Sequence, residues 1–424
     1  MKAIVVVGLG YGDEAKGSIT DHLTWKYGAK TVVRYNGGAQ AAHRVVTPEG
    51  REHVFAQFGS GTLAGAATFL SRYMLVDPPA LRNEGTHLES MGITNPYAKM
   101  FIDKNAKIVT PYHRSANRIK EMLRGDGRHG SCGMGIGEAM DQHVCNPDLT
   151  IVVGDVASKS TLIEKLELQR QLLVGRLQGL KLPSEAGRDW ELINDPTSPR
   201  DFAGIYDVVL SRTNIVPSHS MEYFIKEGPV IFEGAQGVLL DENYGFHPYT
   251  TWSTTLPDNA IRLLSEVGCS DRDRKIYGIL RAYSTRHGPG PFPSEDKSLV
   301  LPDDQNVSNY WQRDFRVGWF DMVMLRYALA ICSIDGLVIT NLDRLAHLPM
   351  WRVCDSYDGL PAIGKPDSLE AQEKLGAALM RCRPDFRDVT PWDFLDEVEM
   401  AGVPVQITSH GKTRLNKVMR SAGE

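Results

Sequence analysis

The sequence predicts an α/β protein with an open, doubly wound and mostly parallel central sheet flanked by helices. The first observation is a set of short β-branched runs, each apolar on both faces and bounded by glycine, proline or polar residues. The second is that the first run leads into a glycine-rich turn and then a helical pattern, the layout of a P-loop-like phosphate site. The predicted strands are Ile4–Val7, Thr31–Arg34, Ile151–Val153, Val230–Phe232, Leu337–Thr340 and Val403–Ile407.

Longer segments with helical spacing separate these runs, and the clearest covers residues 158–182. A leucine stripe there indicates a helix packed against the core or an interface. The polar stretches Pro183–Asp201 and Leu301–Trp311 are predicted to be loops. We therefore expect one domain over residues 1–424, with long loops and a helical segment near 158–200. The leucines of the stripe are Leu162, Leu166, Leu173, Leu177 and Leu180.

Composition and charge narrow the function classes. The chain has 424 residues, 42% hydrophobic and 23% charged, which is ordinary globular composition with enough material for a large core. Its formal net charge of −5 favours neither nucleic acid nor an anionic membrane as a partner. The six cysteines form no CxxC pair, and MKAIVVVGLG runs straight into a polar, glycine-rich stretch. We expect a reduced compartment, no signal peptide and no membrane span, and hence a cytoplasmic protein.

The first predicted strand ends in GLGYGDEAKGS, residues 8–18, which orders glycines, a lysine and a helix start as in phosphate-binding loops. Backbone N–H groups and the helix N-terminus face an anion there, and Lys16 adds positive charge. The strict pattern GxxxxGK followed by Ser or Thr is not met, because Ala15 precedes the lysine and Gly17 follows it. Asp13 and Glu14 would repel phosphate, and Mg²⁺ held by one carboxylate and phosphate oxygens resolves this conflict. The other interpretation is a tight turn that binds nothing.

This loop is the first of six ordered motifs in which the chain resembles the adenylosuccinate synthetase family. Six matches in order, from residue 4 to about residue 414, are far more specific than one glycine-rich loop. The motifs read GYGDEAKGSITD (10–21), RYNGGAQAAH (34–43), FEGAQGVLLD (232–241), GILRAYSTRHGPGPFPSE (278–295), RVGWFD (316–321) and TNLD (340–343).

The resemblance implies a Mg²⁺-dependent ligase that transfers the γ-phosphate of GTP to O6 of IMP, after which aspartate displaces the phosphate from C6. Asp13 corresponds to the base that takes the N1 proton and to a metal ligand, and the carbonyl of Ala42 corresponds to a second metal ligand. His43 corresponds to the acid at the β/γ-phosphate oxygen. Lys16 is expected to neutralise the transferred phosphoryl group, and Gln236 to orient the 6-oxo group. The other loop positions expected at GTP are Gly12, Glu14, Ala15 and Gly17.

The guanine base of GTP is expected beside the motif TNLD. By resemblance, Asp343 accepts hydrogen bonds from guanine N1 and N2, a pairing that adenine does not offer. Asn341 stands where the family has a lysine. Ser409 and Gly411 align with the second wall of the guanine pocket, and Lys412 replaces a proline beside them. GTP is therefore the expected phosphoryl donor.

The positions expected around the acceptor nucleotide depart from the family pattern. Ser131 is kept, but Cys132 replaces a threonine and Met134 an arginine of the phosphate and aspartate sites. No arginine follows Glu138 to match the one that the neighbouring subunit lends to the nucleotide 5′-phosphate in the family. The resemblance implies a homodimer, and we expect one here in which the neighbouring subunit does not supply that arginine. Other positions aligned with the nucleotide are Gln40 for an asparagine, Thr251, and His287 for a valine near the ribose.

The loop expected to bind aspartate is altered as well. Arg313 is kept, whereas Trp311 replaces a threonine and Phe315 replaces a second arginine. A charge-assisted contact of this kind contributes roughly 1.5–3 kcal/mol, so losing two or three would weaken a substrate that needs them by orders of magnitude. The sequence therefore predicts an intact phosphoryl-transfer half and remodelled acceptor and amine pockets.

Three functions follow from this split. The first keeps the family reaction, with IMP or (d)GMP and aspartate giving an N6-succinyl purine nucleotide. The second is a specialised homologue, for instance in nucleoside-antibiotic synthesis, that acts on another purine analogue or with another amine. The third is a GTP-binding protein without catalysis, which the retention of Asp13, Lys16, His43 and Gln236 disfavours.

Overall fold

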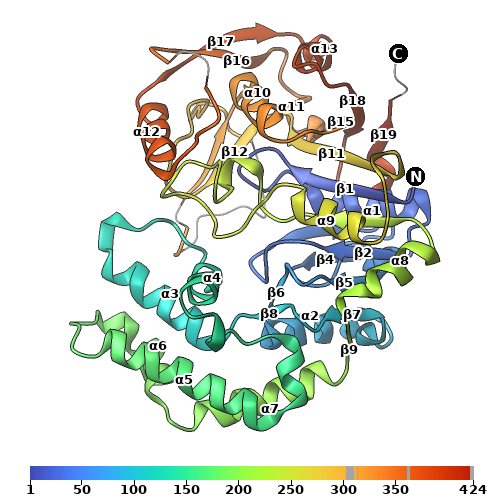
Figure 1. Cartoon of the computed structure of the whole chain (residues 1–424). Helices are drawn as coiled ribbons and strands as arrows, with labels where there is room; N and C mark the ends of the chain where they lie inside the picture. Colours follow the sequence, from blue (N-terminus) through green and yellow to red (C-terminus); the bar gives the residue numbers. More distant parts are fainter. Residues whose placement is uncertain (302–309, 313, 361–362, 421–424) are drawn as a thin grey trace.

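The computed structural model describes residues 1–301, 310–312, 314–360 and 363–420. Its centre is a ten-stranded sheet in the order β19-β18-β15-β11-β1-β10-β2-β5-β7-β9. All neighbouring pairs are parallel except β18 and β19. The predicted open, mostly parallel α/β architecture is confirmed (Figure 1). The strands are β1 Ala3–Gly8, β2 Thr31–Arg34, β5 Ala67–Leu70, β7 Met100–Asp103, β9 Asn214–Val216, β10 Val230–Glu233, β11 Arg274–Arg281, β15 Gly336–Thr340, β18 Val405–Ser409 and β19 Lys417–Met419.

Alternate residues of β1 show how helices cover the two faces of the sheet. Val5 packs in one core with Leu263 of α9 (Asp258–Glu266). Ile4 packs in a second core with Ile19 of α1 (Lys16–Tyr27). Since successive strand residues point to opposite faces, a strand that is apolar throughout requires this double cover. The remaining helices that flank the sheet are α2 Pro78–Ser90, α8 Met221–Glu227, α10 Met322–Ile331, α11 Leu342–Leu345 and α13 Phe394–Glu399.

A group of helices lies beyond one end of the sheet, at the bottom of Figure 1. The predicted helix 158–182 is confirmed as α5, Lys159–Leu177, but Leu180 of the predicted leucine stripe lies beyond its end and is exposed. The predicted loop Pro183–Asp201 is wrong, because α6 (Gly187–Asn194) lies within it and α7 (Ser198–Leu210) begins there. Proline and aspartate in that stretch occupy the first turn of α7, where a helix tolerates both. The group is completed by α3 Pro111–Leu123 and α4 Ile136–Cys145.

The predicted strand Ile151–Val153 is also wrong. Val153 begins a 3₁₀-helix, Val153–Ala157, and pairs with no strand of the sheet. Ile151 and Val153 are buried in the core of the helical group, so the run is apolar because it is packed there. The predicted loop Leu301–Trp311 lies mostly outside the described residues.

Smaller sheets surround the carboxyl edge of the main sheet. In the part of the chain that the structure describes, no helix combines the length and apolar character needed to cross a bilayer. The two-stranded sheets pair β12 Ser284–His287 with β13 Phe315–Gly318, β3 His43–Val46 with β4 Glu52–Phe55, and β6 Leu75–Val76 with β8 Lys107–Ile108. A three-stranded sheet has the order β14 Phe320–Asp321, β16 Trp351–Asp358 and β17 Arg383–Val389, and α12 is Leu369–Leu379.

Candidate active site

The predicted motifs meet at the carboxyl edge of the parallel sheet. β1 leads into the phosphate loop, residues 8–18, and β10 leads within three residues to Gln236. β2 leads into the segment that ends at His43, and β15 leads directly to Asn341. The sheet extends from β1 in both directions, so this edge is a topological switch point, where open α/β sheets bind ligands.

Glu14 shapes the phosphate loop from inside. Its Oε1 accepts hydrogen bonds from the backbone N–H groups of Gly12 (2.8 Å) and Gly10 (3.1 Å). Its Oε2 lies 2.5 Å from Nζ of Lys16, and both side chains are about 3% exposed. Thr340 Oγ1 donates to the Glu14 carbonyl at 3.0 Å, which ties the loop to the end of β15. The second carboxylate that looked out of place in a phosphate loop thus holds the lysine and two glycines in place.

Left-handed backbone concentrates at this edge. Among the described non-glycine residues, positive φ angles occur at Asp13 (62°), Ala15 (66°), Gln236 (57°), Asn341 (60°) and Asn95. The first four all belong to the predicted site. Such a conformation costs a non-glycine residue roughly 1–3 kcal/mol and persists where surrounding contacts enforce it, as in functional sites.

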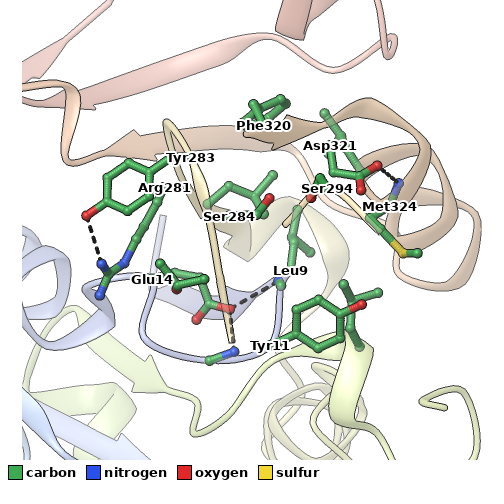
Figure 2. A pocket seen from close by; sticks show the side chains of 16 residues that line it. Leu9, Tyr11, Glu14, Arg281, Tyr283, Ser284, Ser294, Phe320, Asp321 and Met324 are labelled. Atoms are coloured by element: carbon green, nitrogen blue, oxygen red, sulfur yellow. Dashed lines mark hydrogen bonds between the residues drawn. The ribbon is translucent and has the colours of Figure 1, made fainter. Parts of the chain in front are cut away.

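A small cavity lies directly behind the phosphate loop, and Figure 2 shows its lining. Its volume of about 30 Å³ suits water rather than a nucleotide. Asp321 on its wall accepts hydrogen bonds from Tyr357 Oη (2.7 Å) and the backbone N–H of Met324 (3.1 Å), and burial raises the pKa of Asp321 to about 6. The Arg286 guanidinium stacks 4.2 Å above the ring of Tyr11. These contacts of Asp321, Arg286 and Tyr11 support the phosphate loop on the side of the cavity.

His43 is held by a buried carboxylate that the sequence reasoning did not single out. Its Nδ1 lies 2.7 Å from Oε1 of Glu233, the last residue of β10. The other Glu233 oxygen accepts from the backbone N–H of Ser60 (3.0 Å) and lies 4.0 Å from Nε of Arg34. Burial alone would raise the pKa of Glu233, but His43, Arg34 and Ser60 together lower it to about 2. Glu233 is therefore an anion that orients the imidazole and favours its charged form, although burial lowers the pKa of His43 itself.

Gln236 is positioned by a reciprocal pair of hydrogen bonds between two loops. Asn36 Nδ2 donates to the Ala235 carbonyl (3.1 Å), and the Ala235 N–H donates to Asn36 Oδ1 (2.8 Å). A Cβ on Gly37 would lie 2.6 Å from the Ala235 Cβ, so this close approach requires glycine there. Oε1 of Gln236 is buried without a hydrogen-bond partner among the described residues, which leaves its carboxamide available to a ligand.

The residues expected around guanine lie at the ends of the neighbouring strands β15 and β18. Asp343 is exposed, and Asn341 Oδ1 is buried without a partner in the described part of the chain. Ser409 Oγ donates to the Gly411 carbonyl at 3.3 Å. Lys417 donates to the same carbonyl at 2.8 Å, and burial lowers the pKa of Lys417 to about 8. The residues expected at the guanine base therefore lie at or just beyond the ends of two neighbouring strands.

The altered segment around Ser131 packs against the altered amine loop. Ser131 Oγ donates to Asn117 Oδ1 at 2.8 Å, and burial raises the pKa of the Cys132 thiol. A Cβ on Gly133 would lie 3.0 Å from the indole of Trp311, so these segments are in close contact. The Arg118 guanidinium lies 5.6 Å from that indole and donates to the Gly133 carbonyl at 3.2 Å.

Other predicted nucleotide positions lie on separate loops. Gln40 follows the Gly37–Gly38 turn, and its Oε1 is buried with no partner within the described ranges. Thr251 donates its backbone N–H to Leu240 at 2.8 Å. Arg313 lies outside the described residues.

Asp13 meets two residues of the GILRAYSTRH motif, neither of which was assigned to it from sequence. Oδ2 of Asp13 lies 3.3 Å from Nε2 of His287. Arg281 Nε donates to the backbone carbonyl of Asp13. The sequence predicted His287 at the ribose, so its contact with Asp13 is a new finding of the structure. Strands β11 and β1 are neighbours in the sheet, and this brings Arg281 to the phosphate loop. The sequence alone does not reveal that strand order.

The donor set at the loop suits Mg²⁺. The described residues contain no group of three or more His, Cys, Asp or Glu side chains poised around one point. Mg²⁺ commonly takes only one or two carboxylates and completes its shell with waters and substrate phosphates. Both oxygens of Glu14 are engaged within the loop, whereas Asp13 is 29% exposed and Ala42 is exposed. Asp13 and the Ala42 carbonyl are thus the groups that fit a phosphate-bound Mg²⁺.

Comparison with known proteins shows which family this chain resembles. The family model described as adenylosuccinate synthetase matches residues 5–415. The adenylosuccinate synthetase of Thermoplasma acidophilum is 32% identical over 384 residues, covering 88% of this chain and 83% of the relative. That of Syntrophobacter fumaroxidans is 31% identical over 446 residues and covers 98% of both chains.

Two solved structures share the fold. Fully ligated adenylosuccinate synthetase from Plasmodium falciparum superimposes with a TM-score of 0.79 at 21% identity, covering 99% of this chain and 100% of that one. The succinoaminodeoxyadenylate synthetase of cyanophage S-2L, bound to dGMP and to dATP as energy donor, gives a TM-score of 0.58 at 18% identity, covering 99% and 95%.

Proposed function

This chain belongs to the adenylosuccinate synthetase family and is a ligase that forms C–N bonds, and we propose that it activates the 6-oxo group of a purine nucleotide with GTP. The acceptor is IMP or (d)GMP, and aspartate is the amine that gives an N6-succinyl purine nucleotide. The observation that supports this proposal is that three features lie together at one edge of the sheet. They are the phosphate loop held by Glu14, the His43–Glu233 pair, and Gln236, whose Oε1 has no partner among the described residues.

In the first half-reaction, O6 of the purine attacks the γ-phosphorus of GTP and GDP leaves. Asp13 takes the proton from N1, so that the electron pair of the lactam can move to O6. Gln236 donates its carboxamide N–H to the 6-oxo oxygen and fixes the base in the attacking orientation. His43, held by Glu233, donates a proton or hydrogen bond at the β/γ bridging oxygen as charge develops there. Lys16, which begins α1 and is held by Glu14, is assigned to the same charge.

Mg²⁺ fits the Asp13 carboxylate and the Ala42 carbonyl, and when bound it neutralises charge on the phosphate oxygens. The backbone N–H groups at the start of α1, which follows Ala15 at the N-cap, add to this field. Asp343, Ser409 and Gly411 hold the guanine of GTP across the β15–β18 pair.

In the second half-reaction, the aspartate nitrogen attacks C6, the C6–O bond breaks so that O6 leaves as part of the phosphate, and the ammonium group of aspartate gives up two protons to solvent and keeps one as N6–H. We assign the segment around Ser131 and Cys132 and the loop carrying Arg313 to the acceptor phosphate and the aspartate. Gln40, Thr251 and His287 are assigned to the nucleotide. We also propose a homodimer, in line with the family.

A nucleotide panel tests the proposal. The protein is incubated with Mg²⁺, GTP or ATP, and IMP, GMP or dGMP, with and without aspartate, and phosphate release and product mass are followed. We expect aspartate-dependent phosphate release with GTP and one acceptor, and a product heavier than the acceptor by the mass of aspartate minus one water. Asp13→Asn serves as control, since it should abolish turnover while a fluorescent GTP analogue still binds. The absence of turnover with every acceptor and aspartate would refute the proposal.

A second candidate keeps the first half-reaction and changes the amine. It is favoured by the replacement of polar family residues by Met134, Trp311 and Phe315, which make apolar and aromatic contacts here. Met134 packs on Ile136, and Trp311 is stacked against Gly133. The same panel with other amino acids in place of aspartate distinguishes the two, because turnover with another amine alone would select this candidate.

A further inference from the structure

The carboxylate of Asp13 contacts His287, the last residue of β12 in the small β12–β13 sheet. Nε2 of His287 lies 3.3 Å from Oδ2 of Asp13. Because an ionised carboxylate accepts but does not donate hydrogen bonds, we expect the imidazole nitrogen that faces it to carry a hydrogen. Nδ1 of His287 is buried without a partner among the described residues, so the polar contact that the structure shows for this ring is the one between Nε2 and Asp13.

The backbone of the β12–β13 strand pair fixes the position of the His287 ring. His287 pairs with Phe315 across the antiparallel β12–β13 ladder, and the Gly288 N–H donates to the Asp314 carbonyl at 3.0 Å just beyond it. The Phe315 ring packs against the imidazole with a centroid distance of 4.8 Å. The ring is therefore held by a strand pair and an aromatic neighbour rather than by a free loop.

Phe315 also lies near Arg281, a second residue that contacts Asp13. The Arg281 guanidinium lies 5.8 Å from the Phe315 ring, and Arg281 Nε donates to the Asp13 backbone carbonyl. Arg281 thus holds the main chain of Asp13, His287 holds its carboxylate, and Phe315 packs against both. Asp13 has a left-handed backbone (φ 62°), a conformation that persists where surrounding contacts such as that of Arg281 enforce it.

We propose that His287 is a positioning residue that aims the Asp13 carboxylate at the acceptor purine, with Phe315 as its packing partner. The two positions that break the family pattern here, His287 and Phe315, would then act as one unit. The inference rests on the proposed function for the role of Asp13, but the contact itself is independent of it. Partners that orient catalytic ligands in this way typically change activity roughly 10–100-fold when they are removed.

Three substitutions at residue 287 test the role. His287→Gln places an amide nitrogen near the position of Nε2, His287→Asn places one near Nδ1, and His287→Val removes the donor. We expect His287→Val and His287→Asn to lower kcat roughly 10–100-fold, with less than about a threefold change in the KM of the acceptor, and His287→Gln to recover most of the loss. Equal activity of the Gln and Asn variants would overturn the proposal. So would a higher KM at unchanged kcat, which would indicate a direct nucleotide contact instead.

A measurement without turnover separates this inference from the proposed function. In protein with ¹⁵N-labelled histidine, the His287 signals are assigned by their loss in His287→Gln. We expect the Nε2–H tautomer in the wild type and a shift of its signal in Asp13→Asn. An Nδ1–H tautomer, or signals that do not respond to Asp13→Asn, would refute the pairing. If the wild type turns over no acceptor, the proposed function fails while these spectra still decide whether His287 holds Asp13.

Discussion

Glu14→Gln is the substitution that most sharply tests how the phosphate loop is held. The change keeps the size of the side chain but leaves the buried Lys16 ammonium, now 2.5 Å from the carboxylate, without its counter-charge. Removing one partner of a buried ion pair costs about 3–5 kcal/mol, because the remaining charge is desolvated and unpaired. The carboxamide also has one acceptor oxygen in place of two, so it can hold the N–H groups of Gly10 and Gly12 or face Lys16, but not both.

Urea unfolding measures this loss, and Glu52→Gln provides a matched control. Glu52 pairs with Arg44 through two hydrogen bonds of 2.6 and 2.8 Å, but its side chain is 38% exposed. Exposed pairs contribute about 1 kcal/mol or less, so Glu52→Gln should unfold nearly as the wild type does. We expect Glu14→Gln to lose about 3 kcal/mol and to bind GTP more weakly. A loss below about 1 kcal/mol, or equal losses in both variants, would refute the account of the loop.

Three further predictions concern the neighbouring groups. Burial raises the pKa of Asp321 to about 6, so the stability this carboxyl contributes is present below about pH 4 and is lost as the pH rises through 6. The unfolding free energy of the wild type minus that of Asp321→Asn should fall by about 3 kcal/mol between pH 4 and 7, and a flat difference would contradict the shift. Glu233→Gln should lower kcat roughly 10²-fold with GTP binding kept, because His43 loses the anion that orients it; an unchanged kcat would show that catalysis does not depend on the Glu233 carboxylate. Asp343→Asn should reduce the preference for GTP over ATP in kcat/KM by roughly 10–100-fold, and an unchanged ratio would place guanine recognition elsewhere.

Local patterns in the sequence predicted the strands that line the site. Thr31–Arg34 is β2 with the same bounds, and Val403–Ile407 differs from β18 by two residues at each end. These runs are identifiable because double burial in a parallel sheet demands apolar residues on both faces. Ile151–Val153 has the same composition but owes it to burial in the helical group. Periodicity over three residues cannot distinguish these two causes.

The contacts that complete the site depend on strand order, which the sequence does not reveal. Arg34 and Glu233 are far apart in the sequence, and they meet because β2 and β10 are neighbours. Arg281 reaches Asp13 because β11 lies beside β1. The Glu233 carboxylate was visible in the motif FEGAQG, and a buried acid at the end of an apolar strand could have signalled a cationic partner.

Oxygen tracing gives the most direct test of purine activation. Acceptor nucleotide labelled with ¹⁸O at position 6 is incubated with the protein, Mg²⁺, GTP and aspartate, and the released phosphate and the product are analysed by mass spectrometry. If O6 attacks the γ-phosphorus and leaves as phosphate, one ¹⁸O appears in each phosphate released and none remains at C6 of the product. Unlabelled phosphate released alongside the coupled product would contradict activation of the purine oxygen by GTP.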